Sequence, residues 1–169
     1  MIPDLCNALS QLDYPRESYQ VVLIDDGSTD GTGALMEQQA ASRSGWHVLK
    51  FPKSAGKASA LNTALAHFPF GEILYIFDAD HRPDSRALKH AVRYFYAPRV
   101  AAVTGFTRVL NPIASPSAFY STVESYTNQL VTIRAKDRLG LAPALLGSNC
   151  AYRREPLLAC GGFRDGAFS

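Results

Sequence analysis

Residues 72–81, with the sequence EILYIFDADH, decide the fold of this chain. The mostly apolar run stops abruptly at Asp78, which is typical of a buried strand that ends at the surface. Residues 20–25, QVVLID, form a second run of this kind and lead into Asp26. Because segments with helical period lie between such runs, we expect the α/β fold class, with a mostly parallel central sheet flanked by helices.

Further elements follow from the same patterns. Asp30 or Thr32 is expected to cap one helix, and Pro83 and Asp84 are expected to open another. Strands are expected at residues 47–51, 100–104 and 145–152, and helices at residues 5–12, 32–43, 58–68, 83–95 and 155–160. Because the chain shows no repeat and no low-complexity tract, residues 1–169 are interpreted as one domain.

The composition indicates a soluble globular protein. Hydrophobic residues make up 47% of the 169 residues, and the net charge of +2 without a basic stripe argues against a nucleic-acid partner. Three cysteines without metal-ligand spacing favour a reducing compartment over a disulfide framework or a zinc site. No stretch approaches the roughly 18 apolar residues of a membrane span.

An apolar stripe with steps of three and four runs through residues 119–133. Such a stripe is typical of a helix that packs on the core. Because Arg134, Lys136 and Arg138 follow it, a membrane surface or a partner helix is the alternative.

Acidic residues follow both of the best strands. Because ligands bind outside the carboxyl ends of parallel strands, both clusters should face one crevice. Asp78 and Asp80 can together hold a hard divalent cation and, through it, a nucleoside diphosphate. The alternative is turn formation and capping before Pro83. For Asp25 and Asp26 the turn and cap interpretation is equally good.

Three other side chains lie in or near these motifs. Lys57, close to a helix start, can meet a phosphate or can be a solvated surface charge. His81 is an outer metal ligand or a capping residue, and Cys150 is expected to be a small buried residue. The absence of a G-x-G-x-x-G motif after the first strand argues against a nicotinamide cofactor.

Four segments occur in a recognisable order: VVLIDDGSTDGT, KSAGKASALNTAL, ILYIFDADHRPD and LLGSNCAYRREPLLACGGF. This set resembles family 2 glycosyltransferases of the GT-A fold, a Rossmann-like fold of nucleotide-diphospho-sugar transferases. It is most similar to the membrane-associated cellulose, hyaluronan and poly-N-acetylglucosamine synthases. The resemblance covers nearly the whole chain.

The resemblance implies a role for each matching residue. Asp26 would contact uracil and ribose, with Asp25 beside it, and Lys57 would lie close to the nucleotide. Asp78 and Asp80 match the DxD motif, which holds the sugar nucleotide and its Mg²⁺ or Mn²⁺. The acceptor side of the pocket would contain Gly147, Ser148 and Asn149.

The family's first strand and its general base have no match in this chain. The domain is therefore expected to be truncated at both ends, and the catalytic base is expected beyond Ser169. Asp165 lies near the position of the base, but its spacing does not match the family, so no residue is assigned to this role. We expect a marginally stable or associating chain that transfers sugar poorly.

The activity that the resemblance implies is inverting transfer of a sugar, expected to be a UDP-linked hexose or N-acetylhexosamine, to a glycan or lipid-linked acceptor. A sugar nucleotidyltransferase and a non-catalytic nucleotide-binding or assembly module are the alternatives. The full-length parent is expected on the cytoplasmic side of a membrane.

Overall fold

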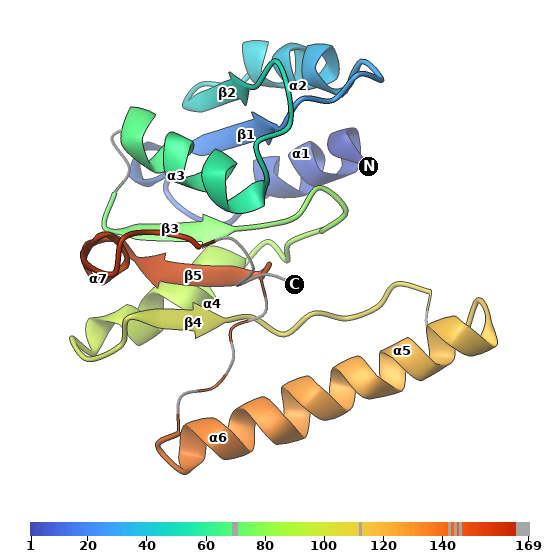
Figure 1. The fold of residues 1–169 in the computed structure, drawn as a ribbon, viewed down its shortest axis with the longest axis vertical. Helices are drawn as coiled ribbons and strands as arrows, with labels where there is room; N and C mark the ends of the chain where they lie inside the picture. Colours follow the sequence, from blue (N-terminus) through green and yellow to red (C-terminus); the bar gives the residue numbers. More distant parts are fainter. Residues whose placement is uncertain (69–70, 112, 142, 144, 146, 165–169) are drawn as a thin grey trace.

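The computed structural model describes residues 1–68, 71–111, 113–141, 143, 145 and 147–164. Helices and strands alternate through most of the chain, as the apolar runs predicted (Figure 1). In chain order the strands are β1 (Val21–Asp25), β2 (Trp46–Lys50), β3 (Ile73–Ile76), β4 (Ala102–Thr104) and β5 (Cys150–Arg153). The α-helices are α1 (Ile2–Ser10), α2 (Thr32–Ala41), α3 (Lys57–His67), α4 (Ala87–Val92), α5 (Pro116–Thr127), α6 (Arg134–Arg138) and α7 (Arg154–Ala159).

The strands form two sheets in the described part of the chain. β1 and β2 pair in parallel, whereas β5 lies between β3 and β4 and is antiparallel to both. Figure 1 shows β1 to β4 pointing the same way, with only β5 reversed. The α/β class is therefore confirmed, but the strand pairing is less parallel than expected.

The direction of β5 has a local cause. The Gly105 amide, one residue after β4, donates to the Asn149 carbonyl one residue before β5, with a distance of 2.7 Å. The chain thus enters β5 at the same end of the sheet at which it left β4. β5 must therefore run antiparallel to β4. A sequence pattern marks a strand but carries no information on this return.

An open space separates the two sheets. It is a cavity of about 810 Å³ between β1 and β3, which we call the interstrand cavity, and its walls include side chains of α1 and α3. No described strand pairs with the cavity-facing edge of β1 or β3.

The core of the described residues forms three clusters, and Phe77 and Leu88 from the segment after β3 pack against the first of them. The first cluster contains the buried face of α1, with Leu5 and Leu9, and packs on β1 and β2. A second cluster joins Ala58 and Leu65 of α3 to Ile76 of β3. α3 therefore contacts both halves of the molecule.

One helix start and one helix cap differ in detail from the predictions. α4 begins at Ala87 rather than Pro83, because the Asp84 carboxylate accepts from the Arg86 amide (2.9 Å) and holds the preceding residues in a turn. α2 begins at Thr32, whose amide donates to the Asp30 carboxylate at 3.0 Å. Gly31, with φ of 87°, occupies the cap position between them.

The apolar stripe of residues 119–133 is the clearest wrong prediction. Its helix is continuous from α5 through a π-helical turn, Asn128–Ile133, into α6, and Figure 1 shows it apart from the sheets. Phe119 is 57% exposed and Val123 49%, whereas Ile133 is only 8% exposed. The buried positions of this helix are Thr122, Gln129 and Ile133, and only Ile133 belongs to the predicted stripe.

Candidate functional site

Both acidic clusters lie where the sequence predicted, at the carboxyl ends of β1 and β3. Because these strands point the same way, the two strand ends lie on one side of the molecule (Figure 1). The interstrand cavity extends to this side, where Asp26, Lys57 and Asp78 contribute to its lining.

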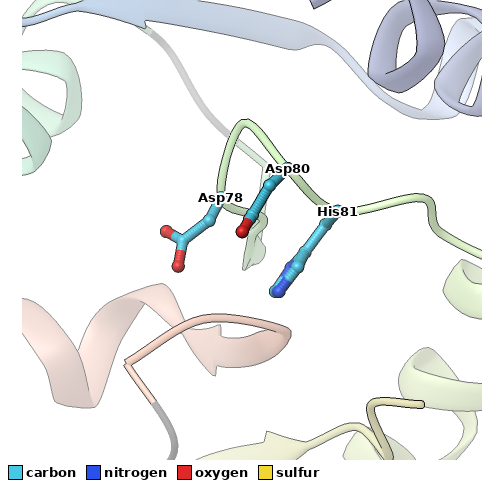
Figure 2. A group of neighbouring side chains, drawn as sticks. All are labelled: Asp78, Asp80 and His81. Carbon is cyan, nitrogen blue, oxygen red and sulfur yellow. The ribbon is translucent and has the colours of Figure 1, made fainter. Parts of the chain in front are cut away.

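The loop after β3 brings three potential metal ligands together. One ligand atom from each of Asp78, Asp80 and His81 lies within 4.8 Å of the other two (Figure 2). The His81 amide donates to the Asp78 carbonyl at 3.0 Å, which closes the turn that places them. The carboxylates are oxygen ligands and are open to solvent, so this group fits Mg²⁺ or Mn²⁺ better than Zn²⁺.

Lys57 is the first residue of α3 and reaches this group. Its Nζ lies 2.5 Å from Asp78 Oδ1, and the two side chains are 39% and 40% exposed. Lys57 is therefore paired with the acidic loop, and its side chain remains partly exposed. Together Asp26, Asp78, Asp80 and Lys57 carry a net charge of about −2 at neutral pH, which a divalent cation can neutralise.

Asp26 fixes the loop that leads into α3. Its carboxylate accepts from the Ser54 hydroxyl (2.7 Å) and from the amides of Ala55 (2.7 Å) and Gly56 (3.0 Å). The Ala55 amide is the main cause that lowers the pKa of Asp26, and the Ser54 hydroxyl and Gly56 amide add to it. Gly27 allows this approach, because a Cβ there would lie 2.5 Å from the Ser54 nitrogen.

Asp25 has a different role from its neighbour. It is buried, and its Oδ1 accepts from the Ser28 amide at 2.9 Å. A Cβ at Gly33 would lie 2.3 Å from its Oδ2, so α2 can approach this carboxylate only through a glycine. Of the two interpretations left open for Asp25, the structure supports the turn.

The predicted acceptor segment, residues 147–149, lies beside the acidic loop. Ile76 pairs with Cys150 in antiparallel register, so the residues before Cys150 run next to those after Ile76. Gly147 and Ser148 are half-buried there. Cys150 is fully buried, as expected of a small core residue.

Asn149 is held by residues that the sequence did not identify. It has a positive φ of 53°, which is uncommon for a residue with a side chain. The Tyr75 hydroxyl donates to Asn149 Oδ1 (2.7 Å), and Asn149 Nδ2 donates to Thr107 Oγ1 (3.1 Å). Burial, with a smaller effect from the charge of Cys150, raises the pKa of Tyr75 to about 12, so its hydroxyl remains a donor.

The general base of the reaction is not assigned to any residue of this chain. Residues 165–169, which include Asp165 and Ser169, lie outside the described residues. The expectation that the base follows Ser169 therefore stays a prediction.

In the described part of the chain, none of the helices has both the length and the apolar character needed to cross a bilayer.

Comparisons with known proteins agree with this geometry. A mannosyltransferase, PcManGT from Pyrobaculum calidifontis, solved in complex with GDP-Man and Mn²⁺, superposes with a TM-score of 0.69 at 30% sequence identity. The match covers 96% of this chain and 43% of that one. The chain thus has the α/β GT-A fold of nucleotide-sugar transferases.

The comparisons of sequence identify the family. The family model described as Glycosyl transferase family 2 matches residues 2–160, and the chain belongs to this family. Beta-monoglucosyldiacylglycerol synthase of Nostoc sp. (strain PCC 7120 / SAG 25.82 / UTEX 2576) is 32% identical over 98% of this chain and 35% of its own length. Cellulose synthase 2 of Novacetimonas hansenii is 28% identical over 90% of this chain and 10% of its own length. The resemblance read from the four motifs is confirmed.

Proposed function

We propose that this chain carries the donor-binding part of an inverting glycosyltransferase, which moves a sugar from a nucleotide sugar to a glycan or lipid-linked acceptor. The observation that supports this most is the convergence of Asp78, Asp80 and His81 within 4.8 Å, next to the ammonium group of Lys57. Support for the ligand classes comes from the GDP-Man in the solved neighbour and from the name of the Nostoc relative, which specifies a glucosyldiacylglycerol.

In this proposal the acidic loop holds the donor through a metal ion. Asp78 and Asp80 would be the ligands of Mg²⁺ or Mn²⁺, with His81 beside them. When bound, the cation would supply positive charge that stabilises the departing nucleoside diphosphate. Lys57 would add a second positive charge at the same phosphates.

The neighbouring residues would set the shape of the site. Asp26 orders the loop before α3 and would face the base and ribose of the nucleotide, while Asp25 supports the turn beneath it. Residues Gly147, Ser148 and Asn149 would border the acceptor. A UDP-linked hexose or N-acetylhexosamine is the proposed donor.

Calorimetric titration tests the donor site. UDP and, separately, GDP are titrated into the purified chain with and without Mn²⁺, and Asp80→Asn is expected to weaken Mn²⁺-dependent binding at least about tenfold, since it removes one charged ligand. Asp137→Asn on α6 makes the same chemical change far from the acidic loop in sequence and should leave binding unchanged.

Two results would contradict the proposal. One is Mn²⁺-dependent binding that Asp80→Asn leaves intact in a sample shown to be folded by circular dichroism. The other is pyrophosphate release from a nucleoside triphosphate and a sugar phosphate, which would favour the nucleotidyltransferase alternative.

A further inference from the structure

The helix that continues from α5 into α6 has no helix or strand of another segment packed closely along it in the described part of the chain. In Figure 1 it forms the lower edge of the molecule, apart from both sheets. Most of the large apolar side chains that are exposed in the described residues lie between residues 106 and 141. Those on the helix, which we call the apolar helix surface, are Phe119, Tyr120, Val123, Leu130 and Val131.

Positive charge accompanies this surface. Arg134, Lys136 and Arg138 are exposed on the last turns of the helix, and Arg108 is in the segment that precedes it. The acidic residues of the same region, Glu124 and Asp137, are fewer. None of the ion pairs among described residues involves the three basic residues of α6.

We propose that the apolar helix surface and the basic end of α6 dock on an anionic lipid bilayer. A helix with exposed aromatic and aliphatic residues and with basic residues at its flank is suited to lie in the interface of a bilayer rather than to cross it. The bilayer supplies both an apolar layer for Phe119 and Val123 and negative charge for α6.

The charge argues against a second copy of this chain as the partner. In a symmetric dimer in which the two helices run parallel, the positive charges of both α6 segments would lie close together, where like charges are unfavourable. Anionic lipid instead supplies the complementary charge. The inference rests on the helix alone and does not depend on the proposed transferase activity.

Vesicle co-sedimentation measures the docking directly. The chain is titrated with vesicles of phosphatidylcholine alone and of phosphatidylcholine with about a quarter phosphatidylglycerol. Each basic residue near such a surface contributes about fivefold in affinity, so the triple variant Arg134→Gln, Lys136→Gln, Arg138→Gln should bind the anionic vesicles about 100-fold more weakly. Phe119→Gln with Val123→Gln should weaken binding to the same vesicles, because it removes exposed apolar area and retains helix propensity.

A matched control changes the same amount of charge elsewhere. Lys53→Gln, Arg93→Gln and Arg99→Gln together remove three exposed positive charges outside this helix and should bind like the unaltered chain. On the unaltered chain, about 0.5 M NaCl should release most of the bound protein, because it screens the attraction.

Several outcomes would overturn the proposal. If the control triple variant loses as much affinity for anionic vesicles as the α6 triple variant, net charge alone attracts the chain to lipid. Vesicle binding that is insensitive to salt and to lipid charge would show that the basic end of α6 does not contribute to docking. No sedimentation with anionic vesicles, together with an oligomer that Phe119→Gln and Val123→Gln convert to a monomer, would assign the surface to a second copy.

Discussion

The carboxylate of Asp26 determines where the chain enters α3. Two backbone amides and one hydroxyl donate to it, and all three belong to residues 54–56, immediately before Lys57. A carboxylate with several such donors is stabilised in its charged form. Asp26 thus has a structural role in addition to the ligand contact proposed for it.

This role makes stability depend on pH in a definite direction. The pKa of Asp26 is lower in the folded chain than in the unfolded chain. Its contribution is therefore present in full above the unfolded value of about 4 and is lost as the pH falls through the lowered folded-state value. Asp26→Asn should reduce the free energy of unfolding by about 1 kcal/mol at pH 7, since the side chain is partly solvated, and by less below pH 3.

Urea unfolding at pH 7, 4 and 3 measures this effect, and Asp30→Asn, another aspartate with a lowered pKa, shows whether it is specific to the loop. If the free energies of unfolding of Asp26→Asn and of the unaltered chain differ by the same amount from pH 7 to pH 3, the charged form of Asp26 is not the cause of the difference.

Residue by residue, the sequence predicted the acids better than their partners. Asp78 and Asp80 follow an apolar run, so their position at a strand end could be read directly. The contact of Asp26 with residues 54–56 and the contact of Tyr75 with Asn149 join positions far apart in the chain. No local period indicates such pairs, because they form only when the strands are placed side by side.

The element that most depends on a single side chain is the helix of α5 and α6. Gln129, in its π-helical turn, accepts from the Thr107 amide (2.7 Å) and donates to the Thr107 carbonyl (3.2 Å) and to the Ser125 hydroxyl (2.8 Å). The side chain thereby satisfies the backbone of Thr107 as a neighbouring strand would. It attaches the helix to the segment that leaves β4.

Replacing this amide should loosen the attachment. Gln129→Met keeps a similar volume but leaves the partly buried backbone groups of Thr107 without this partner, at a cost of about 1 kcal/mol in the free energy of unfolding. Trypsin should then cleave after Arg108 faster, because the adjoining backbone is less firmly held. The exposed neighbour Asn128→Met is the control, and identical cleavage rates for the two variants would contradict this interpretation of Gln129.

Among the elements, the strands were predictable and the helix registers less so. Residues 72–77 and 20–25 are apolar runs with abrupt ends, and β3 and β1 form within them. The stripe of residues 119–133 is largely exposed, because no other described helix or strand packs closely along α5, and a period in the sequence carries no information on which neighbours a helix will have.

At the scale of the whole molecule, the interstrand cavity has about the volume of a short strand. One strand residue in a sheet occupies about 160 Å³, from a rise of about 3.3 Å, a strand spacing of about 4.8 Å and a layer spacing of about 10 Å. The cavity of about 810 Å³ therefore has room for about five residues, which is the length of β1. Its two unpaired edges can accept an extended segment from another molecule.

We therefore expect the isolated chain to associate as its concentration rises. Analytical ultracentrifugation between about 1 and 100 μM should show an increasing sedimentation coefficient. Val22→Lys, which places a charge at the cavity, should reduce the association, whereas His47→Lys on the exposed face of β2 should not. A strictly monomeric sample with one cooperative, high-temperature melt would refute the expectation.

The same cavity also divides the molecule into two units that can fluctuate separately. No described backbone ladder crosses from β1 to β3. The described connections between the two halves include α3, the pair of Lys57 with Asp78, and the segment of α1, which forms the ion pairs Asp4–Arg82 and Asp13–Lys89. The proposed nucleotide would touch Asp26 on one unit and Asp78 on the other. Amide hydrogen exchange should then show two levels of protection in the free chain, one for each unit. A bound nucleotide with Mn²⁺ should make the two levels equal, because a ligand that bridges the units makes them open together.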